Sequence, residues 1–189
     1  MNLENISQDL ILSNYSIKDI KSYAQLFFAE KEERLKRIID RISSDMKINY
    51  SELDFSDDSL VIIDRWLVNH VECVKLSKEE HEVKRKSYPA YIEISDWKFS
   101  LDTHSDIVNI GMYFGETIIR KYPNLKWEQH IKGSKRNVNY GHMIIKLGEM
   151  DYMEINPIWL VGVIFTKIIN KKETSLSELF RKCEELMEI

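Results

Sequence analysis

A glutamate and two glycines lie within the segment 106–116, among residues that otherwise favour a helix. Gly111 and Gly115 are four residues apart, and Glu116 follows directly. Each glycine costs roughly 1 kcal/mol relative to alanine in a helix interior, so a compensating close approach of another group is expected. A carboxylate at such a position needs a partner if it is buried, because an unpaired buried charge is costly. This segment is therefore the first candidate for a site.

Glu116 also ends a polar face of the same predicted helix. The members of this face recur at three- and four-residue steps, and they are Asp106, Asn109, Tyr113 and Glu116. Arg120 stands four residues after Glu116, a spacing that allows a surface ion pair worth a few tenths of a kcal/mol. In the alternative, Glu116 is buried and accepts hydrogen bonds from the backbone of a following hairpin or from Trp127. Both interpretations remain open at this point.

The two glycines also have two interpretations. Tight packing of the helix on a neighbouring element is the favoured one, because isolated glycines in helices commonly serve packing. The other is that the bare backbone at Gly111 and Gly115 faces a ligand. A further candidate for contact with a partner is Trp97, which lies near Tyr88 and Tyr91 in a segment of ambiguous structure. Core packing is the more common use of such large aromatic residues.

Other chemistries find little support. The five histidines do not form H-E-x-x-H, and His70 with Cys73 lacks the second ligand pair of a zinc site, so no metal is predicted. Nucleophile and phosphate-binding motifs are absent from the sequence, which therefore predicts no catalytic residue and no cofactor. If the predicted hairpin pairs suitably, His130, His142 and Glu128 would form a small polar cluster. Because the register of that hairpin is left open, surface histidines are the favoured interpretation.

Charge and apolar runs restrict the partners. The 189 residues contain 27 basic and 31 acidic side chains, without the basic patch that nucleic acid requires. The longest apolar run, 158–165, is far shorter than the roughly 20 residues of a membrane span. Cys73 and Cys183 do not suggest a disulfide framework, and the first residues do not resemble a secretory signal. We therefore expect a cytoplasmic protein with neither nucleic acid nor membrane as its partner.

Capping signals and apolar spacing predict the elements that position these residues. Ser16 opens a first helix whose apolar residues, Phe28 among them, recur at three- and four-residue steps as far as Ile42. Ser56 opens a second helix, and its apolar face is expected to continue to Val74.

Three further segments follow before the hairpin. Ser77 begins a short, highly charged helix that ends near Lys86. The segment 91–99 is either extended or a helical turn and stays unassigned. A capping pattern that starts at Thr103 opens the glycine-containing helix, which should end near Lys121.

The rest of the chain predicts a small sheet and two closing helices. The expected strands and helices are 125–132, 138–147 and 152–155, then 158–169 in the core and 176–187. The predicted class is α+β, with several helices packed on a small antiparallel three-stranded meander. We expect a single domain over 1–189, with a helical part at about 1–90 and an α+β part at about 91–189.

The motif Gly111-x-Tyr113-x-Gly115-Glu116, the tryptophan at 127 and the Asn156-Pro157 pair together resemble a group of bacterial domains of unknown function. In that pattern, a helix ends in G-x-Y-x-G-E, a strand carries tryptophan, and N-P precedes a closing helix. The resemblance covers roughly 100–170. It implies an immunity-type or stress-associated partner protein, hence binding rather than turnover, and it supplies no catalytic residues.

Three functional hypotheses follow. The leading one is a cytoplasmic bacterial protein that binds another protein, in an immunity-type or regulatory role. The second is an enzyme with a polar site around Glu116, and the third is a structural or homo-oligomeric element with Trp97 at a symmetric interface. The candidate binding residues are Asn109, Tyr113, Glu116, Arg120, Trp97 and Trp127.

Overall fold

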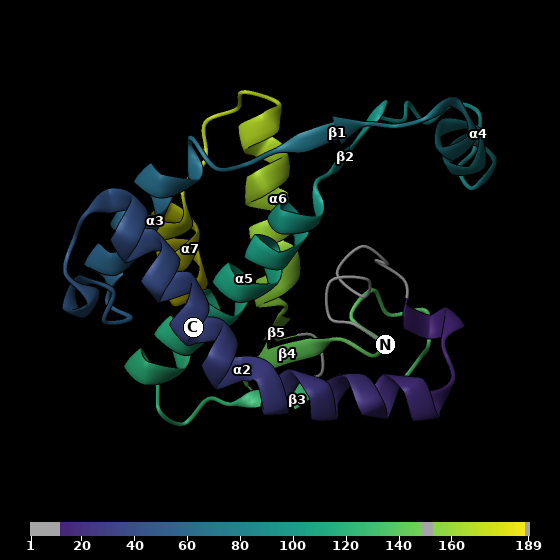
Figure 1. Ribbon diagram of the computed structural model, residues 1–189. Helices are drawn as coiled ribbons and strands as arrows, with labels where there is room; N and C mark the ends of the chain where they lie inside the picture. The colour runs from purple at the N-terminus through teal and green to yellow at the C-terminus, as the bar shows by residue number, and fades with distance from the viewer. Residues whose placement is uncertain (1–11, 149–152, 188–189) are drawn as a thin grey trace.

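The computed structural model describes residues 12–148 and 153–187, which form helices and two small antiparallel sheets (Figure 1). The α-helices are α2 (Ile17–Met46), α3 (Asp57–Leu67), α4 (Lys78–Lys86), α5 (Leu101–Lys121), α6 (Pro157–Ile169) and α7 (Leu176–Met187). Two 3-10 helices are η1 (Leu12–Asn14) and η2 (Tyr50–Glu52). The strands are β1 (Cys73–Lys75), β2 (Trp97–Phe99), β3 (Trp127–Gln129), β4 (Met143–Lys146) and β5 (Glu154–Ile155). The predicted α+β class is confirmed.

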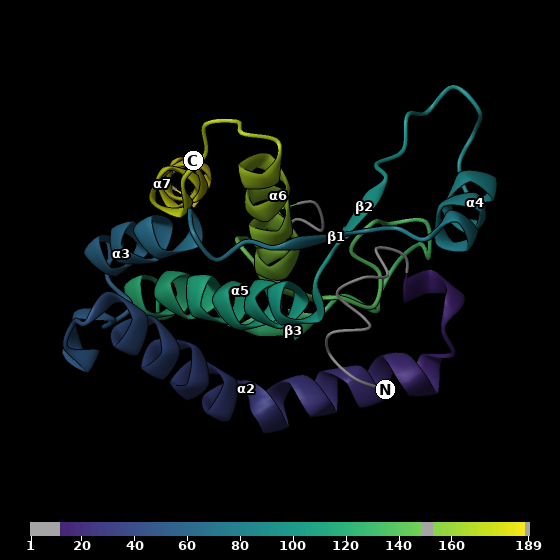
Figure 2. The same cartoon turned by 45° about the horizontal axis from the view of Figure 1, so that its top comes forward.

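Helix α5 is the centre of the fold and packs on α2, α6 and α7 (Figure 2). Because it is covered on several sides, almost every residue from Thr103 to Ile118 is buried. A Cβ atom at Gly111 would lie 2.7 Å from the Cα atom of Ile158 on α6. A Cβ atom at Gly115 would overlap the indole ring of Trp127. The glycines therefore serve close packing, as the favoured interpretation predicted.

One hydrophobic cluster joins the two halves of the sequence. Phe27 and Trp66 from the N-terminal part share this cluster with Phe114 and Phe165 from the C-terminal part. The ring of Phe27 also meets that of Trp127 edge-to-face at 4.9 Å. Burial of such large aromatic side chains is a major stabilising contribution in a domain of this size.

The predicted helix starts are largely confirmed. Ser16 accepts a hydrogen bond from the backbone nitrogen of Asp19, and Ser77 forms a capping box with Glu80 on α4. Asn156 caps α6, whose first turn carries proline. These caps satisfy backbone N–H groups that a helix leaves without intrahelical partners.

A side chain from another helix completes the start of α7. The carboxylate of Asp64 on α3 accepts hydrogen bonds from the backbone nitrogens of Leu176 and Ser177, at 2.6 and 3.2 Å. It also accepts a hydrogen bond from the hydroxyl of Ser175 at 2.7 Å. The start of α7 is thus tied to α3, against which it packs.

The predicted meander is confirmed in the order β3-β4-β5. Trp127 pairs with Ile145, which pairs in turn with Ile155. The strands are shorter than expected, and part of the third predicted strand, including Tyr152, lies outside the described residues.

The second predicted helix was too long. Helix α3 ends at Leu67, and the following residues form β1, which pairs with β2 so that Cys73 lies opposite Phe99. Val74 was placed on the apolar face of the helix because its spacing from Leu67 and Val71 suits a helix. In the structure it is exposed and lies on β1, a strand of only three residues. This two-stranded sheet was not predicted, and it resolves the unassigned segment 91–99 in part as a strand.

Two further details differ from the prediction. Helix α5 begins at Leu101, two residues before the expected capping residue Thr103, because Ser100 serves as the cap. Phe28, placed in the buried stripe of the first helix, is half exposed.

The residues 73–99, comprising β1, α4 and β2, are called the arm. Figures 1 and 2 show that α4 stands away from the other helices at the far end of this two-stranded ribbon. No residue of the arm is fully buried. Phe99, at the base of the arm, packs against the core, whereas most of the arm lies outside it.

Candidate functional site

The Glu116 carboxylate is buried and has two partners. Its Oε1 atom accepts a hydrogen bond from Nζ of Lys31 on α2 at 2.7 Å and another from Nε1 of Trp127 at 2.9 Å. The predicted ion pair with Arg120 is not formed. Arg120 instead lies with its guanidinium carbon 3.5 Å from the ring centroid of Phe55. The alternative of a buried, hydrogen-bonded carboxylate is thus correct, although the donors are side chains rather than backbone groups.

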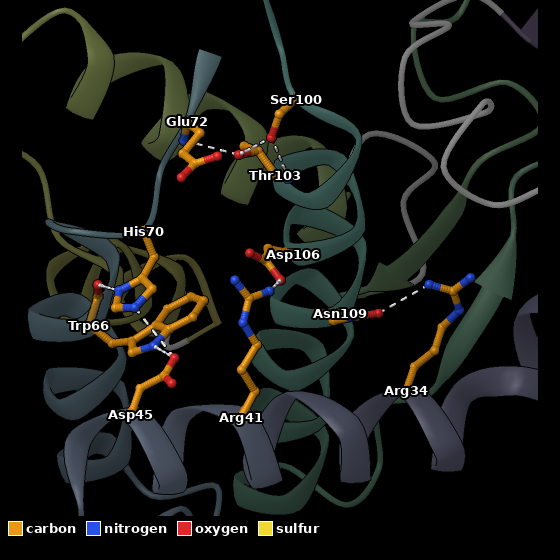
Figure 3. A network of polar contacts seen from close by, with 10 residues as sticks. All are labelled: Arg34, Arg41, Asp45, Trp66, His70, Glu72, Ser100, Thr103, Asp106 and Asn109. Carbon is orange, nitrogen blue, oxygen red and sulfur yellow. Dashed lines mark hydrogen bonds and ion pairs between the residues drawn. The ribbon is translucent and has the colours of Figure 1, made fainter. Parts of the chain in front are cut away.

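Further polar contacts join α2 and α5 (Figure 3). Nη1 of Arg41 donates to Oδ1 of Asp106 at 2.8 Å, and Nη1 of Arg34 donates to Oδ1 of Asn109 at 3.1 Å. Together with Lys31 and Glu116, these pairs form what we call the α2–α5 seam. Each of these three cations on α2 donates to an oxygen acceptor on α5.

Asp106 is the member of the seam whose carboxylate is only partly satisfied by hydrogen bonds. Its Oδ2 atom is buried and has no hydrogen-bond partner among the described residues. Burial raises the pKa of this carboxyl to about 6, although the neighbouring Arg41 acts in the opposite direction. The protonated form is thus easier to accommodate than in water.

Tyr113 is a structural residue. Its hydroxyl donates to Oγ of Ser59 at 2.7 Å and accepts from the backbone nitrogen of Phe55 at 2.9 Å. Its ring is stacked on that of Phe55, with centroids 4.4 Å apart. Burial raises the pKa of the Tyr113 hydroxyl, so the phenol remains a neutral hydrogen-bonding group. Tyr113 therefore fastens the chain that precedes α3.

The base of the arm is fixed by polar contacts, which are drawn at the top of Figure 3. The backbone nitrogen of Glu72 donates to Oγ1 of Thr103 at 3.0 Å, and the hydroxyl of Ser100 donates to the same atom. Nearby, the ring of His70 is stacked on Trp66, whose Nε1 donates to Asp45. These contacts hold the point at which the arm leaves the helices.

His130 and His142 lie close to each other, as the alternative to surface histidines required, and His130 is largely buried beside a carboxylate other than Glu128. The backbone nitrogen of His130 donates to the carbonyl oxygen of His142 at 2.9 Å. The His130 ring, however, meets Glu154 on β5 at 2.7 Å rather than Glu128. Within the described part of the chain, no group of three or more potential ligands could hold a metal ion.

A cavity of about 680 Å³ separates the arm from α5 and α6. We call it the arm cavity, and its lining includes Trp97, Phe99 and Lys84 from the arm and His104, Trp159 and Gly162 from the two helices. Of the predicted binding residues, Trp97 alone lines it. Asn109, Tyr113, Glu116 and Trp127 line neither this cavity nor a second hollow of about 430 Å³ beside Arg120.

Helix α6 differs from its prediction because of this cavity. It was expected to be buried in the core, yet Trp159 is half exposed and Val163 is partly exposed. These residues share one side of the helix with Gly162, and that side faces the cavity. An apolar surface on this side of α6 is thus left without a covering element.

Several residues of these sites were missed from the sequence. Lys31, Arg34 and Arg41 lie among the apolar positions of the first helix, and a cation at a core-facing spacing is a signal that a buried partner exists. His104 and Lys84 gave no such signal, because their position beside the cavity depends on the path of the arm.

Comparisons with known proteins supply no relative. The chain matches no family model, no curated protein and no solved structure. Over residues 12–148 and 153–187, no helix combines the length and the apolar character needed to cross a bilayer.

Proposed function

We propose that this chain is a bacterial cytoplasmic protein that binds another protein through its arm, in an immunity-type or regulatory role. The observation that carries this proposal is the exposure of apolar side chains on an element in which no residue is fully buried. Tyr91 is 88% exposed and Val83 is 65% exposed, and both lie on the arm. Clustered exposed apolar residues on a soluble domain commonly mark an interaction surface.

The arm is ordered by its own contacts, which favours binding. Arg85 on α4 donates to the carbonyl oxygens of Ile92 and Tyr88, at 2.6 and 3.2 Å. Lys98 on β2 forms an ion pair with Glu80 on α4. A surface that is already ordered loses less conformational entropy on association than a flexible one. The arm thus presents Tyr91 and Val83 in a defined arrangement.

The alternative of an enzyme centred on Glu116 has less support. The carboxylate of Glu116 is already satisfied by Lys31 and Trp127. Asn109 and Tyr113 are buried with partners of their own. A catalytic group must reach a substrate in a concave site, and these side chains do not line either cavity described above.

The cytoplasmic location is part of the proposal. Cys73 is an exposed free thiol and Cys183 is a buried one. Free thiols are typical of proteins in reducing compartments.

Site-specific photocrosslinking tests the docking surface. A photoreactive phenylalanine analogue replaces Tyr91, and a second variant carries it at Val138, which is 81% exposed but lies outside the arm. Irradiation in the native cytoplasm should give a discrete crosslinked protein from position 91 only. The same products from both positions, or none from position 91, would refute the proposal. A crosslinked product of twice the chain mass would identify a second copy as the partner.

A further inference from the structure

The arm cavity has the size and shape of a small-molecule site. Its volume of about 680 Å³ falls within the range of roughly 300–1,000 Å³ that is usual for ligand pockets. Its two sides come from segments that are separate in sequence. The arm forms one side, and α5 and α6 form the other.

Flat aromatic groups line both sides of the cavity. Trp97 and Phe99 belong to the arm, and their rings meet edge-to-face at 5.3 Å. Phe99 also meets the ring of His104 on α5 at 5.5 Å. Trp159 on α6 is half exposed at the same cavity. Such groups favour a planar ligand, because aromatic rings pack well edge-to-face or offset-stacked.

Lys84 is the cation of this cavity that lacks a counter-charge. Its Nζ atom donates to Oγ of Ser95 at 2.8 Å, and within the described residues it forms no ion pair. Lys98 also lines the cavity, but Glu80 neutralises it. Glu93 is a further charged member of the lining, and it is exposed.

Burial lowers the pKa of Lys84. A bound anion would favour its charged form, because an opposite charge nearby offsets the loss of hydration. The half-buried ammonium therefore gains from an anionic ligand.

From these observations we infer that the arm cavity binds a small organic anion with a planar aromatic body. The aromatic body lies between Trp97 and Trp159, and the anionic group contacts Lys84. This site is distinct from the exposed surface at Tyr91 and does not depend on it. A protein partner and a small anion could therefore be bound by the same arm.

Two fluorescent probes of nearly the same shape test the site. One is 1-anilinonaphthalene-8-sulfonate, which is anionic, and the other is N-phenyl-1-naphthylamine, which lacks the sulfonate. Titration of the full chain should show one anionic probe bound per chain. The neutral probe should bind about tenfold more weakly, because it forgoes one charge-assisted hydrogen bond.

Two substitutions separate the charge from the cavity. Lys84→Met removes the ammonium and keeps an apolar stem, so the anionic probe should bind about tenfold more weakly while the neutral probe is unaffected. Gly162→Leu narrows the cavity, because a Cβ atom at Gly162 would meet Ile107 only at 3.8 Å and the longer side chain would enter the ligand space, and it should weaken the binding of both probes. Lys75→Met changes an exposed lysine of the same arm outside the cavity and should alter neither affinity.

Thermal unfolding of each variant shows whether it is folded before the titration is interpreted. The inference is overturned if Lys84→Met weakens both probes equally or neither. It is also overturned if Gly162→Leu is folded and binds both probes with unchanged affinity. Glu93→Gln provides a second test, since removal of this negative charge should strengthen the anionic probe or leave it unchanged, and a marked loss would contradict the proposed charge preference.

Discussion

The indole of Trp127 donates a hydrogen bond to Glu116 while its ring covers the bare backbone of Gly115. Trp127 is therefore the partner of two neighbouring residues of α5: it bonds Glu116 through a polar contact and packs closely on Gly115. Lys31 completes the arrangement from α2. The stability of this region should depend on all three contacts together.

The charge pair of Lys31 and Glu116 can be measured by a double-mutant cycle. Lys31→Met leaves a buried carboxylate with the indole alone and should lower the free energy of unfolding by about 2 kcal/mol. In a Glu116→Gln background the same change should lower it by less than about 0.5 kcal/mol, because the charge is gone. Urea unfolding gives the four values, and Lys36→Met on the exposed side of α2 serves as the control. Equal effects in both backgrounds would mean that the pair is not coupled.

The packing of Gly115 can be compared with that of another helical glycine. Gly115→Ala should destabilise by about 2 kcal/mol, since the new Cβ atom would overlap the indole of Trp127. Gly162→Ala meets no atom closer than 3.8 Å and should stabilise by about 0.5 to 1 kcal/mol through helix propensity. Thermal and urea unfolding of both variants provide the measurement. A stabilised Gly115→Ala would show that the indole moves freely.

Asp106 should make stability depend on pH in a particular direction. Its pKa in the folded chain is about 6, above the ordinary value of 3.8, because of burial. The folded state therefore binds the proton of this carboxyl more tightly than the unfolded state does. The resulting contribution to the free energy of unfolding is fully present below about pH 4, and it is lost as the pH rises through about 6. Relative to Asp106→Asn, the wild-type free energy of unfolding should fall by roughly 2 kcal/mol between pH 4 and 7.

The control for this measurement is Asp40→Asn, which changes an exposed aspartate of α2. Its pH profile should run parallel to that of the wild type. A parallel profile for Asp106→Asn as well would mean that Asp106 is ionised in the folded chain throughout this range.

The two cysteines should react at very different rates. Cys73 is exposed on β1, whereas Cys183 is buried on α7, where burial raises the pKa of its thiol to about 11. Only the thiolate is nucleophilic, so a disulfide reagent such as Ellman's should modify one thiol per native chain and both after denaturation. Cys73→Ser should abolish the fast reaction. Rapid modification of the Cys73→Ser variant would show that α7 opens readily.

The predictions that depend only on residues near one another in the sequence were accurate. Ser16 and Ser77 were predicted to open helices, and each accepts the expected hydrogen bond from a backbone nitrogen of the first turn. The spacing of Gly111 and Gly115 likewise indicated a helix approached closely by other groups. These features depend on residues within one turn or on the absence of a side chain.

The features that failed depend on residues far apart in sequence. Lys31 is 85 residues from Glu116, so the nearer Arg120 was the more obvious partner. Strands β1 and β2 have three residues each, too few to show a period. The exposed side of α6 could not be recognised either, because an apolar helix has the same composition whether it faces a core or a cavity.

The contact of Asp64 with the first residues of α7 has a consequence for the order of folding. A helix of 12 residues is marginal in water when isolated, and here the backbone N–H groups of its first turn donate hydrogen bonds to a side chain more than 100 residues earlier. During synthesis α3 leaves the ribosome long before α7. Because the acceptor is synthesised first, α7 can complete its first turn only where α3 holds Asp64 in position.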